Sequence, residues 1–176
     1  MRLLIASLLF FIYSNCFGQN QKNYALTQVN LFNGYENKIY NNAIVLVKSG
    51  KIERIGKVGE TIPAGYEVID CQNYYLMPGM IDAHSHLDNL AAAKRALETG
   101  VTTVRTAGVA AYQDVALANL ALSGKIAGPD VISAGVYVSP NLEETILADT
   151  RLGVLINGVR TDEELKLLVN VNIDRG

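Results

Sequence analysis

The chain has 176 residues, with 15 basic and 17 acidic side chains and a formal net charge of −2. This near-neutral balance gives no signal for binding nucleic acid or an anionic membrane surface. Only two cysteines are present, which excludes a small fold that several disulfides hold together.

The first 18 residues are typical of a secretory signal peptide. Arg2 precedes an almost entirely apolar run over residues 3–13, and Cys16 and Gly18 are small residues at the two positions that a signal peptidase reads. The run is about half of the ~20 residues that a spanning helix needs. We expect cleavage before Gln19, export to a bacterial periplasm or to the medium, and no membrane span afterwards. An uncleaved N-terminal anchor and a lipid-modified Cys16 are the alternatives.

Residues 19–77 have the pattern of a small β-module. Short β-branched and aromatic runs alternate with turn signals, among them Ser49-Gly50. Strands are predicted over residues 25–31, 44–47, 51–55 and 66–71. We expect a small antiparallel sheet, which at about 50 residues is too small to bury a comfortable core alone. Cys71, left without a partner once the signal is removed, is expected to be a small core residue.

From Pro78 onward, strands alternate with helices. Strands are predicted over residues 80–86, 101–104 and 130–134, and helices over residues 89–99 and 111–123, each helix stopped by a glycine. Residues 135–158 are irregular, with a short helix near Glu143. A capping box, Thr161-x-x-Glu164, opens a last helix. This order predicts an α/β fold with parallel strands and crossover helices.

The apolar faces of the last two helices follow from their spacing. In the helix over residues 111–123, Val115, Ala118 and Leu122 are predicted to face the core, with Tyr112 and Asp114 as surface or packing residues. In the final helix the predicted buried side carries Leu165, Leu168, Val169 and Ile173.

The only two histidines of the chain, His84 and His86, are separated by one residue at the end of a predicted strand. Side chains two apart on a strand point to the same face, so the two imidazoles can converge on one first-row metal ion. Asp82 shares their parity and could orient a ligand or accept a backbone N–H. The alternative is a pair of half-buried strand histidines that contact only their neighbours.

Three segments carry a family resemblance: residues 78–86, residues 100–108 and residues 123–129. They resemble the first-strand signature, the second-strand segment and the approach to the third strand of the amidohydrolase superfamily, closest to its imidazolonepropionase-like and prolidase-like branch. Two positions depart from that pattern. Thr106 stands where the family usually has an aspartate, and Asp130 follows Pro129 where the family usually has a basic residue.

The resemblance implies a fold: a partial (β/α)8 TIM-like barrel over residues 78–176, with about the first three strand-helix units, preceded by a small antiparallel β-sandwich module over residues 19–77. It also implies a chemistry, in which His84 and His86 are metal ligands and metal-activated water hydrolyses a carbon–nitrogen bond in a small molecule or dipeptide amide. The expected cofactor is a divalent metal, zinc foremost, with one or two ions in a complete enzyme. No catalytic residue and no other cofactor-binding residue is assigned in this chain.

The same resemblance implies more ligands than the chain holds. A catalytic zinc takes three protein ligands, and a barrel of this type needs about 250 residues. We therefore expect the N-terminal part of a longer enzyme, which hydrolyses nothing alone. Two alternatives remain: a non-catalytic exported β-rich binding module, and a deaminase of the same superfamily. Metal uptake distinguishes the hydrolase from the binding module, which needs no metal.

Overall fold

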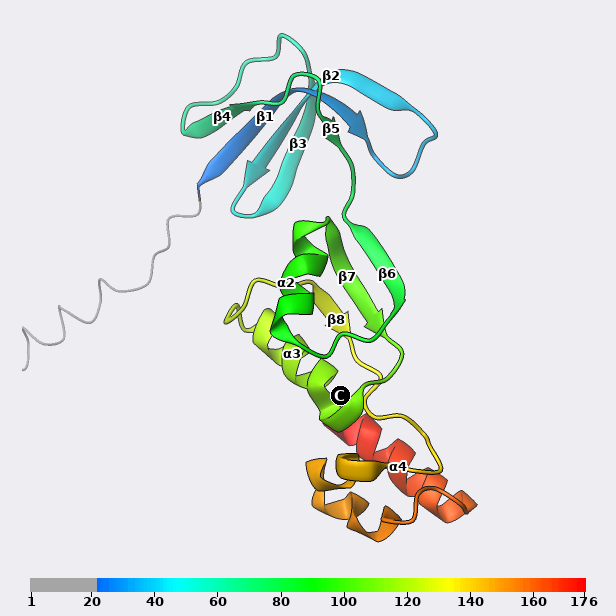
Figure 1. Ribbon diagram of the computed structural model, residues 1–176. Helices are drawn as coiled ribbons and strands as arrows, with labels where there is room; N and C mark the ends of the chain where they lie inside the picture. The colour runs from blue at the N-terminus through cyan, green and yellow to red at the C-terminus, as the bar shows by residue number, and fades with distance from the viewer. Residues whose placement is uncertain (1–21) are drawn as a thin grey trace, which may run out of the picture. The chain divides into compact units, whose positions relative to one another are not determined.

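The computed structural model describes residues 22–176, which form two compact units with the division between Pro78 and Gly79 (Figure 1). The predicted signal peptide, residues 1–18, lies outside the described residues. Within residues 22–176, no helix combines the length and the apolar character that crossing a membrane requires.

The first unit is built on one five-stranded sheet in the order β3-β2-β1-β4, with β5 also paired to β1. The strands are β1 (Asn23–Phe32), β2 (Ile39–Lys48), β3 (Lys51–Lys57), β4 (Tyr66–Asp70) and β5 (Tyr75–Leu76). The predicted turn at Ser49-Gly50 joins β2 to β3 as an antiparallel hairpin, and both turn residues have positive φ, at 50° and 73°. Positive φ at both central residues is what the type I′ hairpin turn requires.

The prediction of a wholly antiparallel module is wrong, because β4 and β5 both run parallel to β1. The segment between β3 and β4 carries the chain from one edge of the sheet to the other instead of turning back as a hairpin. Ile62 in this segment packs against the buried side chains of Ala25, Ile44 and Leu46. That contact holds the crossing segment over the face of the sheet, and β4 therefore enters beside β1 in the same direction.

The second unit confirms the predicted parallel α/β arrangement. Its sheet has the order β6-β7-β8, all parallel. The strands are β6 (Met80–Ser85), β7 (Val101–Thr106) and β8 (Asp130–Ile132), and the crossover helices are α2 (Leu90–Glu98) and α3 (Gln113–Leu122). Ala93 of α2 and Leu117 of α3 share one buried cluster with Val104 of β7, so both helices cover the same face of the sheet (Figure 1).

Helix α3 differs from its prediction in both its start and its buried face. It begins at Gln113 after a short turn, η1 (Ala110–Tyr112), in which Ala111 and Tyr112 have left-handed backbone conformations. Its buried residues are Asp114 and Leu117, whereas the predicted core residue Leu122 is 86% exposed. The cause is a hydrogen-bonded environment for the Asp114 carboxylate, described below with the site.

A helical lobe follows β8 and is built from η2 (Glu143–Ala148), η3 (Thr150–Leu155) and α4 (Asp162–Arg175). The predicted capping box at Thr161 and Glu164 is present. The lobe buries Leu152, Leu155, Leu168 and Val171 completely. Only Leu168 of the four residues predicted for the buried side of α4 is in this core. The buried face of α4 is the one that carries Leu168 and Val171, and Ile173 lies on the exposed side.

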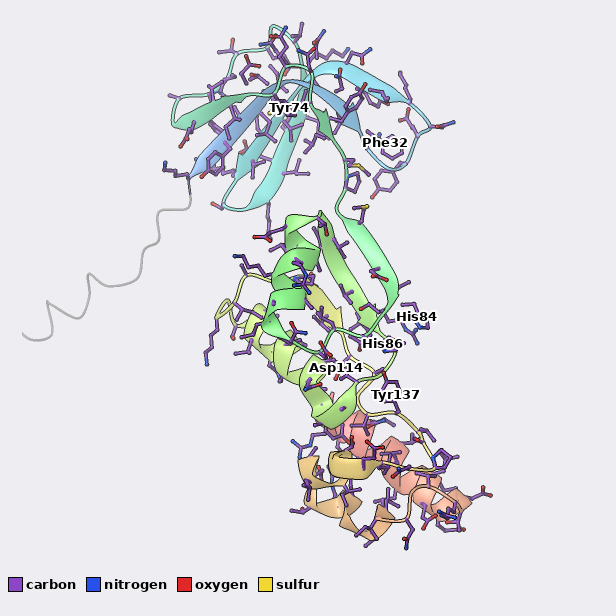
Figure 2. All side chains as sticks on the ribbon, in the orientation of Figure 1. Phe32, Tyr74, His84, His86, Asp114 and Tyr137 are labelled. Carbon is purple, nitrogen blue, oxygen red and sulfur yellow. The ribbon has the colours of Figure 1, made fainter. Side chains whose placement is uncertain are left out.

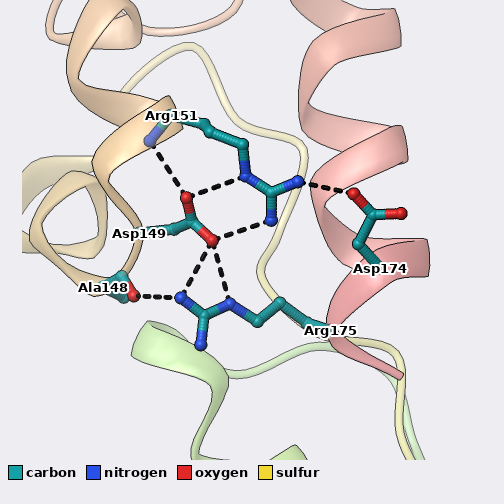
Figure 3. Close-up of polar contacts among 5 residues, drawn as sticks. All are labelled: Ala148, Asp149, Arg151, Asp174 and Arg175. Carbon is teal, nitrogen blue, oxygen red and sulfur yellow. Dashed lines mark hydrogen bonds and ion pairs between the residues drawn. The ribbon is translucent and has the colours of Figure 1, made fainter.

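One carboxylate holds α4 to the rest of the lobe (Figure 3). Asp149 accepts hydrogen bonds from the backbone and guanidinium of Arg151 and from Arg175 Nε at 2.9 Å. Arg151 also pairs with Asp174, and Arg175 Nη2 donates to the carbonyl of Ala148. The Arg151 hydrogen bonds are the main cause that holds the pKa of Asp149 well below its ordinary value.

Because of this network, we expect the free energy of unfolding to fall in acid. Because the pKa of folded Asp149 is lowered, its stabilising contribution is present above the unfolded pKa of about 4 and is lost as the pH falls toward the folded pKa. We expect Asp149→Asn to be less stable than wild type at pH 7 and to lose less stability than wild type between pH 5 and pH 3. Urea unfolding across this range measures the difference. The exposed Asp130→Asn is the matched control, and a slope in Asp149→Asn equal to that of wild type would contradict the assignment.

Candidate metal site

The predicted histidine pair lies at the carboxyl end of the parallel sheet in the second unit. There β6 ends, the backbone of Ala107 just after β7 donates to the carbonyl of Ser85 at 2.8 Å, and the backbone of Val109 donates to the carbonyl of Gly135 beyond β8 at 3.0 Å. The ends of all three strands are therefore tied together. The carboxyl ends of parallel strands are where α/β folds place their ligands.

Strand β6 has a bulge between Asp82 and Ser85, the interval that contains His84. Asp82 pairs with Val104 and Ser85 with Thr106, so β6 has one more residue than β7 across this interval. Bulges next to functional sites change the direction of side chains. The prediction that Asp82 faces the same side as the histidines assumed that side chains alternate regularly along β6, and the bulge interrupts that alternation. The Asp82 carboxylate instead accepts a hydrogen bond from the backbone N–H of His84 at 3.0 Å. Asp82 thus takes the backbone-acceptor role, at an exposed position.

The two imidazoles lie close together and are accessible to solvent. Their ring centroids are 5.6 Å apart and their planes are inclined by 82°. Both side chains are exposed, whereas the hydroxyl of Ser85 between them is buried without a partner. Figure 2 shows His84 and His86 at the same end of the sheet, with Tyr137 near them. The structure therefore brings the predicted pair to one place rather than burying the rings against hydrocarbon.

The spacing of the rings is compatible with one shared ion. Because a Zn–N bond is ~2.0–2.1 Å long, the centroid of a ligating imidazole lies ~3.2 Å from the ion, and two such centroids are no more than ~6.4 Å apart. The observed 5.6 Å falls within this limit. Neutral imidazole suits zinc and other first-row metals, so the donor set fits part of a divalent-metal site.

The shortest contact of the His86 ring favours one tautomer. Its Nδ1 lies 2.7 Å from the carbonyl oxygen of Gly108, and a carbonyl only accepts, so Nδ1 carries the proton and donates. Nε2 then holds the lone pair that a metal requires. Metal-binding histidines commonly donate their other ring N–H to a backbone carbonyl in this way, which fixes the orientation of the ring.

Sequence reasoning did not identify Gly108 or Tyr137 as parts of this site. Gly108 has φ of +110°, and a Cβ at this position would lie 2.8 Å from the Tyr137 ring, so glycine is needed for the carbonyl to face His86. The Tyr137 hydroxyl is 3.0 Å from His86 Nδ1. A glycine directly after a predicted strand is a signal for Gly108, whereas the irregular segment containing Tyr137 gives none.

Thr106 and Asp114 also differ from expectation. Thr106, where the resembling family usually has a carboxylate, is fully buried, and its hydroxyl donates to the carboxylate of Asp114 at 2.6 Å. A carboxylate therefore reaches this position from helix α3. Asp114 is itself fully buried, so of the two predicted alternatives it is a packing residue and not a surface residue.

Within the described residues, the candidate ligands that lie close together are this pair. Among residues 22–176, no group of three or more His, Cys, Asp or Glu side chains is arranged to hold a metal ion. Cys71, the one free cysteine in this part of the chain, belongs to the first unit.

Comparison with known proteins identifies relatives of one kind, although no family model matches the chain. The chain is 34% identical to the adenine deaminase of Thermosipho africanus over 92 residues, which are 49% of this chain and 15% of that protein. It is 34% identical to the imidazolonepropionase of Brucella anthropi over 131 residues, which are 71% of this chain and 28% of that protein. The chain thus spans less than a third of either relative.

Solved structures share the fold over most of the chain. A candidate prolidase from Bifidobacterium longum superposes with a TM-score of 0.71 and 28% identity, over 88% of this chain and 39% of that chain. A Xaa-Pro dipeptidase with bound methionine in its active site gives a TM-score of 0.70 at 19% identity, over 88% and 45%. A protein described as an amidohydrolase gives 0.65 at 20% identity, over 88% and 45%. The last two show similarity of fold alone.

Proposed function

We propose that the chain belongs to the amidohydrolase superfamily, to which its relatives by sequence and by fold point, and that it supplies the first two metal ligands of a hydrolase acting on carbon–nitrogen bonds. The single observation that carries the proposal is the pairing of His84 with His86, in which Nε2 of His86 keeps its lone pair because Nδ1 donates to Gly108. A divalent ion bound there supplies Lewis acidity and lowers the pKa of nearby water.

The part that this chain's own residues play is to present and orient ligands. The backbone of His84 is held by Asp82 and the ring of His86 by Gly108, so the His86 imidazole is oriented before an ion arrives. Preorganised ligands lose less conformational freedom on binding. We propose that the remaining ligands come from segments equivalent to the part of the relatives that this chain does not span, and that residues 22–176 alone do not turn over a substrate.

The substrate class is proposed from the relatives. Their names include adenine deaminase, imidazolonepropionase and prolidase, and the common feature of this group is hydrolysis at a carbon–nitrogen bond. Among the structural neighbours, a dipeptidase holds methionine and a prolidase holds an N-methylphosphonate derivative of L-proline. We propose small amides or dipeptides as the class to test first, with deamination as the second candidate that the adenine deaminases favour.

The fold supports placement of this site in a larger barrel. Helices α2 and α3 cover one face of the β6-β7-β8 sheet, while Ile81 and Ile132 in the strands remain more than half exposed. An apolar strand surface of this kind normally packs against further structure. We propose that the three strands are the first part of a (β/α)8 barrel, whose active-site residues collect at the carboxyl ends of its strands.

The proposal is tested by metal uptake. Equilibrium dialysis of the full chain against zinc should give saturation at one ion per chain, with weak affinity because only two ligands are present. Magnesium, which prefers oxygen ligands, should not compete for the site. A chain that retains no zinc above a folded protein lacking histidine would favour the non-catalytic binding module instead.

A further inference from the structure

The buried carboxylate of Asp114 lies in the first turn of α3, and the proposed metal ligation assigns it no task. Its side chain is fully buried, as is that of Thr106 at the end of β7. A carboxylate removed from water carries a large desolvation cost unless several donors compensate for it. Figure 2 labels Asp114 at the start of α3, and its donors come from segments around the ends of β7 and β8.

The donors come from three separate segments. Asp114 Oδ2 accepts hydrogen bonds from the Thr106 hydroxyl at 2.6 Å and from the backbone N–H groups of Ala134 and Gly135 at 3.0 Å each. Asp114 Oδ1 accepts from the backbone of Val115 at 2.9 Å. One side chain thus links the start of α3, the end of β7 and the segment that follows β8.

Two of these segments, the end of β7 and the segment that follows β8, lead to the partners of His86. Gly135, held by Asp114 through its N–H, accepts a hydrogen bond from the backbone of Val109 through its carbonyl, at 3.0 Å. Val109 is the neighbour of Gly108, whose carbonyl receives the proton of His86 Nδ1. A continuous hydrogen-bonded path therefore leads from the Asp114 carboxylate to the histidine ring.

We propose that Asp114 is a positioning residue for metal binding, which acts by holding the Gly108 carbonyl against His86. The ring is thereby kept in the tautomer that protonates Nδ1 and leaves Nε2 open. Thr106 takes part by anchoring the carboxylate. The relevance to metal rests on the proposed function, whereas the effect on the tautomer does not.

The tautomer can be read directly from the nitrogen shifts of the imidazoles by NMR. The chain has only two histidines, so His84 serves as an internal reference. The spectra are recorded at about pH 8.5, two units above the ordinary pKa of a histidine side chain. Wild-type His86 should carry its proton on Nδ1. Asp114→Asn should shift the tautomer ratio of His86 about fivefold toward Nε2–H, the factor that loss of one typical hydrogen bond produces, and should leave His84 unchanged.

Three further variants separate positioning from general damage to the fold. Asp130→Asn makes the same charge change at an exposed site and should leave His86 unaltered. Thr106→Val, which keeps the shape but loses the hydroxyl, should shift the tautomer ratio as Asp114→Asn does. Thr106→Ser, which restores the hydroxyl, should return the ratio to that of wild type. Zinc affinity should fall about tenfold or more in Asp114→Asn, the range for loss of an outer partner of a metal-bound histidine.

The outcomes distinguish this inference from the proposed function. An unchanged His86 tautomer in folded Asp114→Asn or Thr106→Val overturns the inference, even if zinc binds. Unfolding of both variants also overturns it, because the pair would then determine the fold alone. A shifted tautomer in a chain that binds no zinc supports the positioning role and rejects the metal site.

Discussion

Replacement of His86 by alanine should lower the zinc affinity of the chain more than tenfold, and His84→Ala should do the same. Loss of an outer partner alone typically costs 10–100-fold in metal affinity, so loss of one of only two ligands exceeds the lower end of that range. Both rings are exposed and 5.6 Å apart, so the substitutions remove no buried packing. Isothermal titration or competition with a chromogenic chelator gives the affinities.

The matched control is Cys71→Ser. Thiolate is a zinc ligand, and Cys71 is the one free cysteine of the described residues. Its removal should leave zinc affinity unchanged, because the proposed site uses imidazole nitrogens and no thiolate. A loss of affinity in Cys71→Ser comparable with that in the histidine variants would show that zinc binds elsewhere.

Leu168→Ala should reduce the free energy of unfolding by about 2–5 kcal/mol, the range for deleting a fully buried leucine side chain. Leu168 is completely buried at the centre of the helical lobe, in one cluster with Leu152, Leu155 and Val171. The lobe would be left with a cavity that its neighbours fill only in part. Urea denaturation followed by circular dichroism measures the change.

Ile173→Ala is the comparison that tests which face of α4 is buried. Ile173 is 70% exposed, so its truncation should change stability by about 0.5 kcal/mol or less. The helical spacing of the sequence placed Leu168 and Ile173 on the same buried side. Equal losses for the two variants would restore that interpretation and contradict the orientation of α4.

Local signals in the sequence predicted most of the elements. The Ser49-Gly50 turn, the glycines that end α2 and α3, and the capping box at Thr161 each depend on a few adjacent residues, and each is present in the structure. The parallel order of β6, β7 and β8 followed from the alternation of strands and helices. These features are predictable because their physical causes are local.

Features that depend on distant partners were not predictable in this way. The parallel entry of β4 depends on Ile62 packing across the sheet, which no local pattern indicates. The burial of Asp114 in place of Leu122 depends on donors from Thr106 and from the backbone beyond β8. A carboxylate in an amphipathic helix is ordinarily placed on the solvent side, and only the fold reveals the donors that reverse this preference.

The same distinction between local and distant causes applies to the candidate site. His84 and His86 were predicted from their spacing on a strand together with the resemblance of the flanking segments to the amidohydrolase superfamily. The partners of His86, the Gly108 carbonyl and the Tyr137 hydroxyl, come from segments that follow other strands. Their proximity is a consequence of parallel strands ending at one edge, and the sequence could not identify which residues would arrive there.

X-ray absorption spectroscopy of the zinc-loaded chain tests most directly whether His84 and His86 bind the same metal ion. The structure predicts two imidazole nitrogens at ~2.0–2.1 Å from zinc, with oxygen ligands completing the coordination and no sulfur. A spectrum with a zinc–sulfur distance of ~2.3 Å, or with one imidazole only, would contradict the shared site.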